Sequence, residues 1–125
     1  MLDAQDRPDW RDHEENQDPK YRGGVVDGAE TWSKDGSTQG HYLAGLSKDD
    51  VGQAVTFADL PPSAYFVAHV DYVRVVRIMP LGPEEIELRM ECLFMKETLE
   101  DSNYELKNVT DFAITVLEED GAIAE

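Results

Sequence analysis

The feature that most constrains this fold is a stretch at residues 85–94 in which apolar and polar side chains alternate almost without a break. Such alternation is typical of a strand with one face in the core and one face in solvent. We expect the core face to carry the apolar members, which are Ile86, Leu88, Met90, Cys92 and Phe94. Residues 72–79 are rich in β-branched side chains, and residues 80–83 include two prolines and a glycine. The sequence therefore predicts two long strands joined by a turn into an antiparallel hairpin.

A helix is predicted from Asn108, a favourable N-cap residue, to the end of the chain. Apolar residues recur there at three- and four-residue spacing, so they share one helix face. The members of this apolar stripe are Val109, Phe112, Ala113, Val116, Leu117 and Ile123. Asp120 lies on the same stripe, and an ionised carboxylate in an apolar core needs a cation, a hydrogen-bond donor, a metal or water. Asp120 is therefore a candidate site residue; the alternative is a partly exposed acid near a helix end.

The rest of the chain divides into a tail and one domain. Residues 1–20 are charged, nearly free of aliphatic side chains and without periodicity, which predicts a mobile acidic segment. Residues 21–125 form one domain by length, with a further buried strand at 65–70 and polar connections at 37–50 and 96–107. Strands followed by a helix that covers their apolar face give an α+β fold, with an antiparallel sheet packed on a long C-terminal helix.

The composition excludes several classes of function. A formal charge of −16 argues against nucleic acid and anionic membrane surfaces as partners. The single cysteine, Cys92, excludes a disulfide within the chain and a multi-cysteine metal site. No apolar run is long enough to span a bilayer and nothing resembles a signal peptide, so we expect a cytoplasmic location. Glycine-rich phosphate loops and the common hydrolase and zinc motifs are also absent from the sequence.

Four basic residues require an interpretation. His41 follows Gly40 in a predicted loop, and the polarity of that loop explains it. His69 interrupts the apolar run at 65–70 and should point into the interior or a cavity; we favour a hydrogen-bonded core histidine over a ligand. Arg74 and Arg77 lie on opposite faces of an apolar strand, and we expect both to be exposed at an edge or paired with acids of the neighbouring strand.

An ordered set of segments resembles the catalytic domain of Rieske non-haem iron oxygenases, the alpha subunits of aromatic-ring-hydroxylating dioxygenases. These segments are residues 28–32, 60–73, 77–83 and 109–112, and the likeness covers residues 21–125. The resemblance implies a helix-grip fold, like that of START and Bet v 1 proteins, in which a curved antiparallel sheet wraps a long C-terminal helix around an apolar cavity. It further implies a substrate cavity, at which we place His69, Phe66 and Val116.

The resemblance also implies a mononuclear Fe(2+) held by two histidines and one carboxylate, and Asp120 falls at the position of the carboxylate. Such a site leaves coordination positions open for O2 and substrate. In the family, a reductase or ferredoxin donates electrons to a Rieske [2Fe–2S] centre, and that centre passes them to the iron. The alpha subunits commonly form homotrimers. The expected reaction inserts oxygen into an apolar or aromatic substrate.

The sequence departs from the family pattern in two ways. It lacks the Rieske motif, which needs two cysteines and two histidines, and it lacks the Y-H-x4-H segment that supplies the paired iron histidines. We therefore interpret the chain as a fragment of an oxygenase catalytic domain, with an incomplete helix-grip fold, that is inactive alone. The alternatives are a cofactor-free helix-grip module that binds a small hydrophobic ligand and a structural domain without a ligand.

Overall fold

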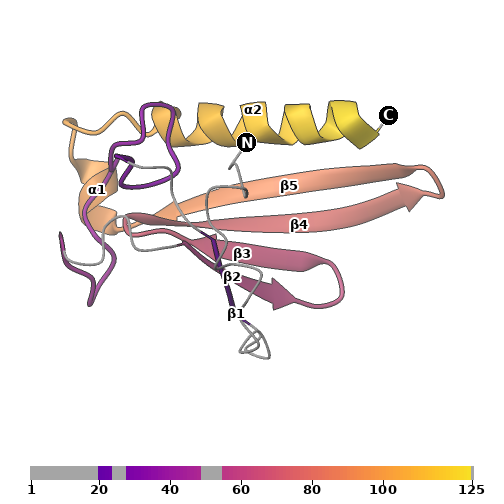
Figure 1. Ribbon diagram of the computed structural model, residues 1–125, viewed down its shortest axis with the longest axis horizontal. Coiled ribbons are helices and arrows are strands. Elements are labelled where there is room, and N and C mark those ends of the chain that lie inside the picture. The colour runs from indigo at the N-terminus through magenta and orange to yellow at the C-terminus, as the bar shows by residue number, and fades with distance from the viewer. Residues whose placement is uncertain (1–19, 24–27, 49–54, 125) are drawn as a thin grey trace.

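The computed structural model describes residues 20–23, 28–48 and 55–124. Within them the elements are β1 (Lys20–Gly23), β2 (Val55–Leu60), β3 (Ala64–Ala68), β4 (Tyr72–Gly82), β5 (Glu85–Phe94), α1 (Lys96–Glu100) and α2 (Lys107–Ala124). The strands form one antiparallel sheet in sequence order, and α2 runs alongside it (Figure 1). The predicted α+β architecture, an antiparallel sheet with a C-terminal helix, is confirmed. The predicted mobile segment 1–20 lies outside the described residues except for Lys20.

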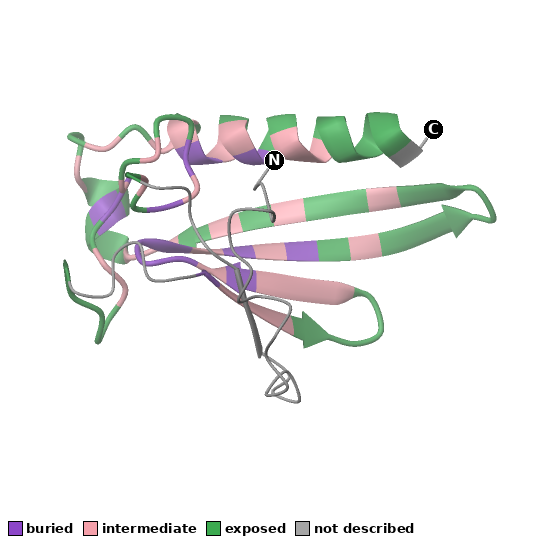
Figure 2. Ribbon diagram, viewed as in Figure 1, coloured by how far each residue is buried: buried purple, intermediate pink, exposed green. Residues whose placement is uncertain are grey.

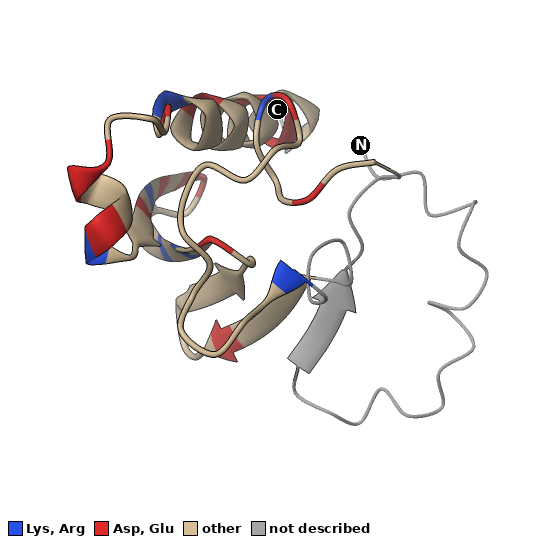
Figure 3. Cartoon of the chain, turned by 90° about the vertical axis from the view of Figure 1, so that its left-hand side faces the viewer, with Lys and Arg blue, Asp and Glu red and all other residues tan. Residues whose placement is uncertain are grey.

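The strand register divides the sheet into two faces. Val67, Arg74 and Cys92 lie opposite one another on β3, β4 and β5, so they point to the same side. We call this side the inner face, because the Trp32 ring of the preceding loop packs against it at Arg74. In the view along the strands, α2 is seen end-on above the sheet (Figure 3). The opposite, outer face carries the alternate residues, such as Phe66.

The inner face is buried at one end and exposed at the other. Val67, Tyr72 and Val76 have no exposed surface, whereas Leu88 and Ile86 are 42% and 56% exposed. The same gradient runs along β4 and β5 in Figure 2, from the end near α1 to the tip of the hairpin. The alternation in β5 therefore predicted the direction of its side chains, but the predicted burial of Ile86 and Leu88 is wrong, because no described element covers the hairpin tip.

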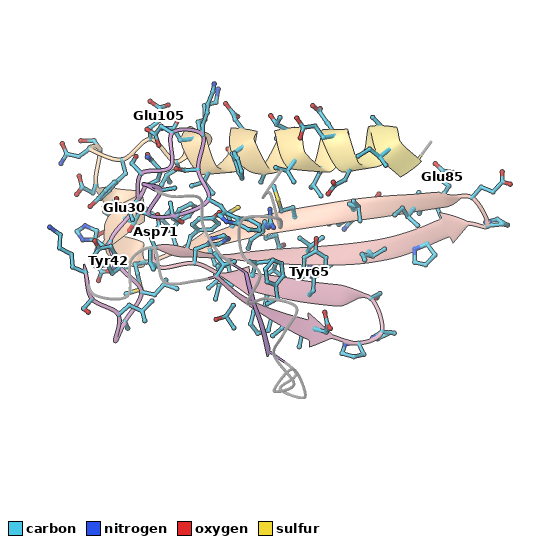
Figure 4. The ribbon with its side chains drawn as sticks, viewed as in Figure 1. Glu30, Tyr42, Tyr65, Asp71, Glu85 and Glu105 are labelled. Atoms are coloured by element: carbon cyan, nitrogen blue, oxygen red, sulfur yellow. The ribbon has the colours of Figure 1, made fainter. Side chains whose placement is uncertain are left out.

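A loop at residues 28–48 covers the buried end and is held there by Asp71 (Figure 4). The Asp71 carboxylate has no exposed surface and accepts hydrogen bonds from Thr31 Oγ1 at 2.8 Å and from the Gln39 backbone N–H at 2.7 Å. Burial raises the pKa of Asp71, and these two hydrogen bonds partly oppose that shift. One buried carboxylate thus joins two points of the loop to the start of β4.

The burial of α2 also declines along its length. Val109 and Ala113 are buried, whereas Ile123 is 79% exposed. The helix begins one residue before the predicted N-cap, so Asn108 lies in its first turn, and the Asn108 carbonyl accepts a hydrogen bond from the Lys34 N–H at 3.0 Å. The loop and the first half of α2 therefore close one end of the molecule together. None of the helices in the described residues is long and apolar enough to cross a membrane.

Three local predictions were wrong or incomplete. β4 continues into the predicted turn at 80–83 and ends at Gly82, with a register shift between Pro80 and Gly82, because a proline is tolerated in a strand where the pairing is irregular. The connection 96–107 contains α1, which is built from good helix formers. β2 was not predicted, because its six residues include an acid and give no clear alternation.

Candidate functional site

Asp120 lies in the last turns of α2, and its side chain is exposed. This exposure agrees with the alternative of an acid near a helix end that is not in the core, because the helix has run past the covered end of the sheet. Throughout the residues that the structure describes, no three His, Cys, Asp or Glu side chains come close enough together to hold a metal ion. The assignment of Asp120 as an iron ligand stays a prediction.

The structure separates the three residues predicted to line the substrate cavity. Phe66 pairs with Val75 and lies on the outer face, so the register does not bring it to the side of the sheet where His69 lies. Val116 is half-buried on α2, on the stripe that begins with Val109. Only His69 and Val116 are placed where an inner cavity could use them.

His69 is the centre of an aromatic cluster at the buried end of the inner face. Its backbone N–H donates to the Tyr72 carbonyl at 2.9 Å, which forms the tight connection between β3 and β4. The imidazole stacks on the Tyr72 ring at a centroid distance of 4.2 Å and lies 5.3 Å from the Trp32 ring. The side chain is 3% exposed, and neither ring nitrogen has a hydrogen-bond partner among the described residues. The predicted inward direction is confirmed, whereas the predicted hydrogen bonding is wrong.

The cluster keeps its aromatic members neutral at pH 7. Burial, with a smaller contribution from the charge of Arg74, lowers the pKa of His69 to about 3. The imidazole therefore presents one N–H donor and one acceptor nitrogen, and both are unused. Burial also raises the pKa of Tyr72, whose hydroxyl donates to the Trp32 carbonyl at 2.7 Å. These groups can donate and accept hydrogen bonds, but they carry no charge.

Arg74 is the site residue that the sequence interpretation missed. Its side chain is 5% exposed, its guanidinium carbon lies 5.4 Å from the centroid of the Trp32 ring, and its Nε has no hydrogen-bond partner among the described residues. The expectation of an exposed or acid-paired arginine is confirmed for Arg77, which lies 3.2 Å from Glu91, and is wrong for Arg74. The available signal was the two-residue alternation in β4, which puts Arg74 in phase with the buried Tyr72.

A second group of polar residues lines a shallow, open pocket of about 190 Å³ at the end of the molecule near α1. Its lining residues are Thr38, Gly40, His41, Tyr42 and Tyr104. His41 lies in a loop as predicted and is exposed, with its Nε2 3.5 Å from an Asp101 carboxylate oxygen, and its backbone N–H donates to Thr98 Oγ1 at 2.8 Å. A side chain on Gly40 would begin 2.7 Å from Thr98 Cγ2, so glycine lets the loop approach α1 closely. These contacts explain the grouping as the attachment of the loop to α1.

Comparison with known families gives this geometry its context. The chain matches the family model described as ring hydroxylating alpha subunit (catalytic domain) over residues 3–125. A search of curated proteins found no match. The family match extends over nearly the whole chain and agrees with the resemblance seen in the sequence. The chain therefore belongs to the family of ring-hydroxylating oxygenase alpha subunits, whose catalytic domain it matches.

Proposed function

We propose that this chain serves in the catalytic domain of a ring-hydroxylating oxygenase, where the inner face of its sheet forms one wall of the pocket for an apolar or aromatic substrate. Family membership supports the oxygenase class. The observation that supports this substrate-binding surface is the strip of apolar side chains at the uncovered end of the inner face. Leu88 and Ile86 are 42% and 56% exposed there, and the half-buried Met90 continues the strip toward the core. Grouped apolar side chains that remain exposed on one face are typical of a binding surface.

The position of α2 supports a helix-grip arrangement of the START and Bet v 1 type. The helix runs along the sheet, and its half-buried Val116 follows the buried Val109 and Ala113 on one stripe. An apolar ligand between such a helix and the sheet would be held by the loss of water-exposed apolar surface, which contributes about 25 cal/mol per Å². We propose that Val116 and Leu88 contact the substrate from opposite sides.

We further propose Asp120 as the carboxylate ligand of the family's mononuclear Fe(2+), which supplies oxygen activation when it is bound. The described residues do not fit an iron site by themselves. Asp120 is exposed and lies about 20 Å along α2 from Lys107, the first residue of the helix. No metal-binding group of three side chains is present in the described part of the chain. We therefore propose that these residues do not turn over substrate alone.

The family reading implies partners that the described residues do not identify. We propose that O2 is the co-substrate and that electrons come from a reductase or ferredoxin through a Rieske [2Fe–2S] centre. A homotrimer is the assembly we propose for the working enzyme.

The substrate wall can be tested with two leucines of the same strand. Leu88 and Leu93 are 42% and 53% exposed, but they point to the inner and outer face respectively. Binding of naphthalene, an apolar two-ring aromatic hydrocarbon, is measured by fluorescence for the wild type, Leu88→Asp and Leu93→Asp. A charge at the contact should weaken binding about tenfold in Leu88→Asp, with no change in Leu93→Asp. Equal losses in the two variants, or no binding to the wild type, would contradict the proposal.

A further inference from the structure

We propose that Arg74 and His69 form a recognition point on the inner face for the carboxylate group of a small anionic ligand. The inference deepens the proposed function, and it rests on that function for the inner face as the ligand-binding wall. It adds the chemical class of the ligand, a carboxylate, because an apolar wall alone has no preference for an anion.

Arg74 and Arg77 provide an internal contrast within β4. Arg77 is on the outer face, with an exposed side chain whose Nη2 lies 3.2 Å from a Glu91 carboxylate oxygen. Arg74 is on the inner face and 5% exposed, and it makes no ion pair with any described acid. Its guanidinium lies over the Trp32 ring, which attracts a cation but leaves the N–H groups free to donate in the plane of the guanidinium. Among the described residues, Arg74 is thus buried without an acidic partner such as Arg77 has in Glu91.

His69 adds a second unsatisfied group beside the same tryptophan. Its ring lies 5.3 Å from the Trp32 ring, and the guanidinium carbon of Arg74 lies 5.4 Å from that ring. Both nitrogens of His69 and the Nε of Arg74 lack partners among the described residues. Three buried polar nitrogens that have no partner in the described part of the chain therefore lie near one indole ring, although most buried polar groups in folded proteins are hydrogen-bonded.

A carboxylate is the group that would complete this arrangement. The guanidinium presents its N–H donors in a flat fork that matches two carboxylate oxygens, and the neutral imidazole adds one further N–H. Water could accept these hydrogen bonds but could not neutralise the buried charge. The formal charge of the chain is −16, so its surface repels anions in general. Anion binding to this chain would therefore have to come from a local site such as this one.

The competing explanation is that Arg74 only fills space in the core. Measurements of protein stability distinguish this explanation from the proposed ligand-binding role. An arginine kept without a counter-ion for a ligand should destabilise the empty protein, so that Arg74→Met, which retains an unbranched apolar chain in place of the arginine stem, should raise the melting temperature by about 3 °C or more. Arg77→Met removes an exposed pair and should leave the melting temperature within about 1 °C. A fall in the melting temperature of Arg74→Met would overturn the inference, because it would show a structural role.

Binding is tested with benzoate, its neutral isostere benzamide, and acetate, each titrated into the full chain while the indole N–H resonance of Trp32 is followed by NMR. We expect benzoate to bind at least about tenfold more tightly than benzamide, and acetate to shift the same resonance weakly. Arg74→Met should abolish the preference for benzoate, and Arg77→Met should retain it. Equal preferences in the two variants would overturn the inference, because binding would then be independent of Arg74.

Comparing naphthalene binding with the preference for benzoate over benzamide tests the proposed function and this inference separately. Binding of naphthalene without any preference for benzoate over benzamide would overturn the inference and leave the substrate wall in place. An Arg74-dependent preference for benzoate without binding of naphthalene would support the carboxylate site and overturn the apolar wall.

Discussion

The two ends of the β4–β5 hairpin have the same alternating sequence pattern and opposite surroundings. At the end near α1, Tyr72 and Val76 are fully buried, and the Tyr72 hydroxyl donates to the Trp32 carbonyl of the 28–48 loop. At the tip, Leu88 and Ile86 point to the same inner face and stay exposed. Apolar residues on one face of a strand thus indicate a face that is suited to burial. Which part of that face is buried depends on the other segments of the chain that pack against it.

The polar residues follow the same division between the two ends. At the covered end the Asp71 carboxylate accepts two hydrogen bonds, whereas Arg74 Nε and both ring nitrogens of His69 have no hydrogen-bond partner among the described residues. The open end carries Asp120 on the exposed turns of α2. We infer that the covered end maintains the fold, and we propose that it orients the ligand while the open end receives the apolar part of the substrate.

The largest expected effect is at the anchor of the covered end. Asp71→Ala removes a buried carboxylate that accepts two hydrogen bonds, and it leaves Thr31 and Gln39 without an acceptor. We expect the free energy of unfolding to fall by about 4 kcal/mol in urea denaturation. Asp59→Ala, at an exposed aspartate of β2, serves as the control and should stay within about 0.5 kcal/mol of the wild type. Similar losses of unfolding free energy in both variants would contradict the view that Asp71 anchors the loop and Asp59 does not.

The next effect is a pH dependence that originates at the covered end. The folded-state pKa of His69 is about 3, against 6.5 for the free side chain, so below pH 6.5 the unfolded chain binds more protons. Stability should therefore fall as pH decreases from about 6.5 toward 3, and the loss between pH 7 and pH 4.5 should be roughly 3 kcal/mol. Urea titrations at several pH values should show that His69→Phe lacks this loss.

The exposed His41 provides the matched control for that pH series. Because its side chain is 49% exposed, His41→Phe should retain the decline in stability between pH 7 and pH 4.5. Parallel pH curves for the wild type and His69→Phe would show that His69 is not the group responsible.

A smaller effect compares one apolar residue from each end of the inner face. Val76→Ala creates a gap in a fully buried site and should cost about 2 kcal/mol of unfolding free energy. Leu88→Ala removes a larger side chain that is 42% exposed, and it should cost about 0.5 kcal/mol. A greater loss for Leu88→Ala, measured by urea denaturation, would mean that the hairpin tip is covered in solution.

The smallest expected effect concerns metal binding at the open end. Because the described residues offer Asp120 no nearby metal-binding partners, anaerobic titration with Fe(2+) should give the same weak binding for the wild type and Asp120→Ala. Tight binding that is lost in Asp120→Ala would contradict our view that these residues do not form an iron site alone.

The sequence predicted the parts of this fold that depend on short-range periodicity. The strands at 72–79 and 85–94 and the helix after Asn108 follow from spacings of two and of three to four residues, and each exists in the structure. Burial depends on which distant segment arrives to cover a face. Residue spacing could not show that the stripe on α2 leaves the covered region before Asp120.

The candidate site was harder to predict for the same reason. His69 was identified as an inward residue, but its ring lies beside that of Trp32, which comes from a loop 37 residues earlier in the sequence. Arg74 was assigned by residue type, since arginine is seldom buried, although the alternation in β4 placed it inside. Asp71 received no role, because its partners Thr31 and Gln39 meet it only in the folded chain.

The central claim, that the open end of the inner face receives an apolar aromatic ligand, is tested most directly by methyl NMR during a titration with naphthalene. We expect the methyl resonances of Ile86, Leu88 and Met90 to shift, while those of Val73 and Leu93 on the outer face remain in place. Shifts confined to the outer face, or no shifts at saturating naphthalene, would contradict the claim.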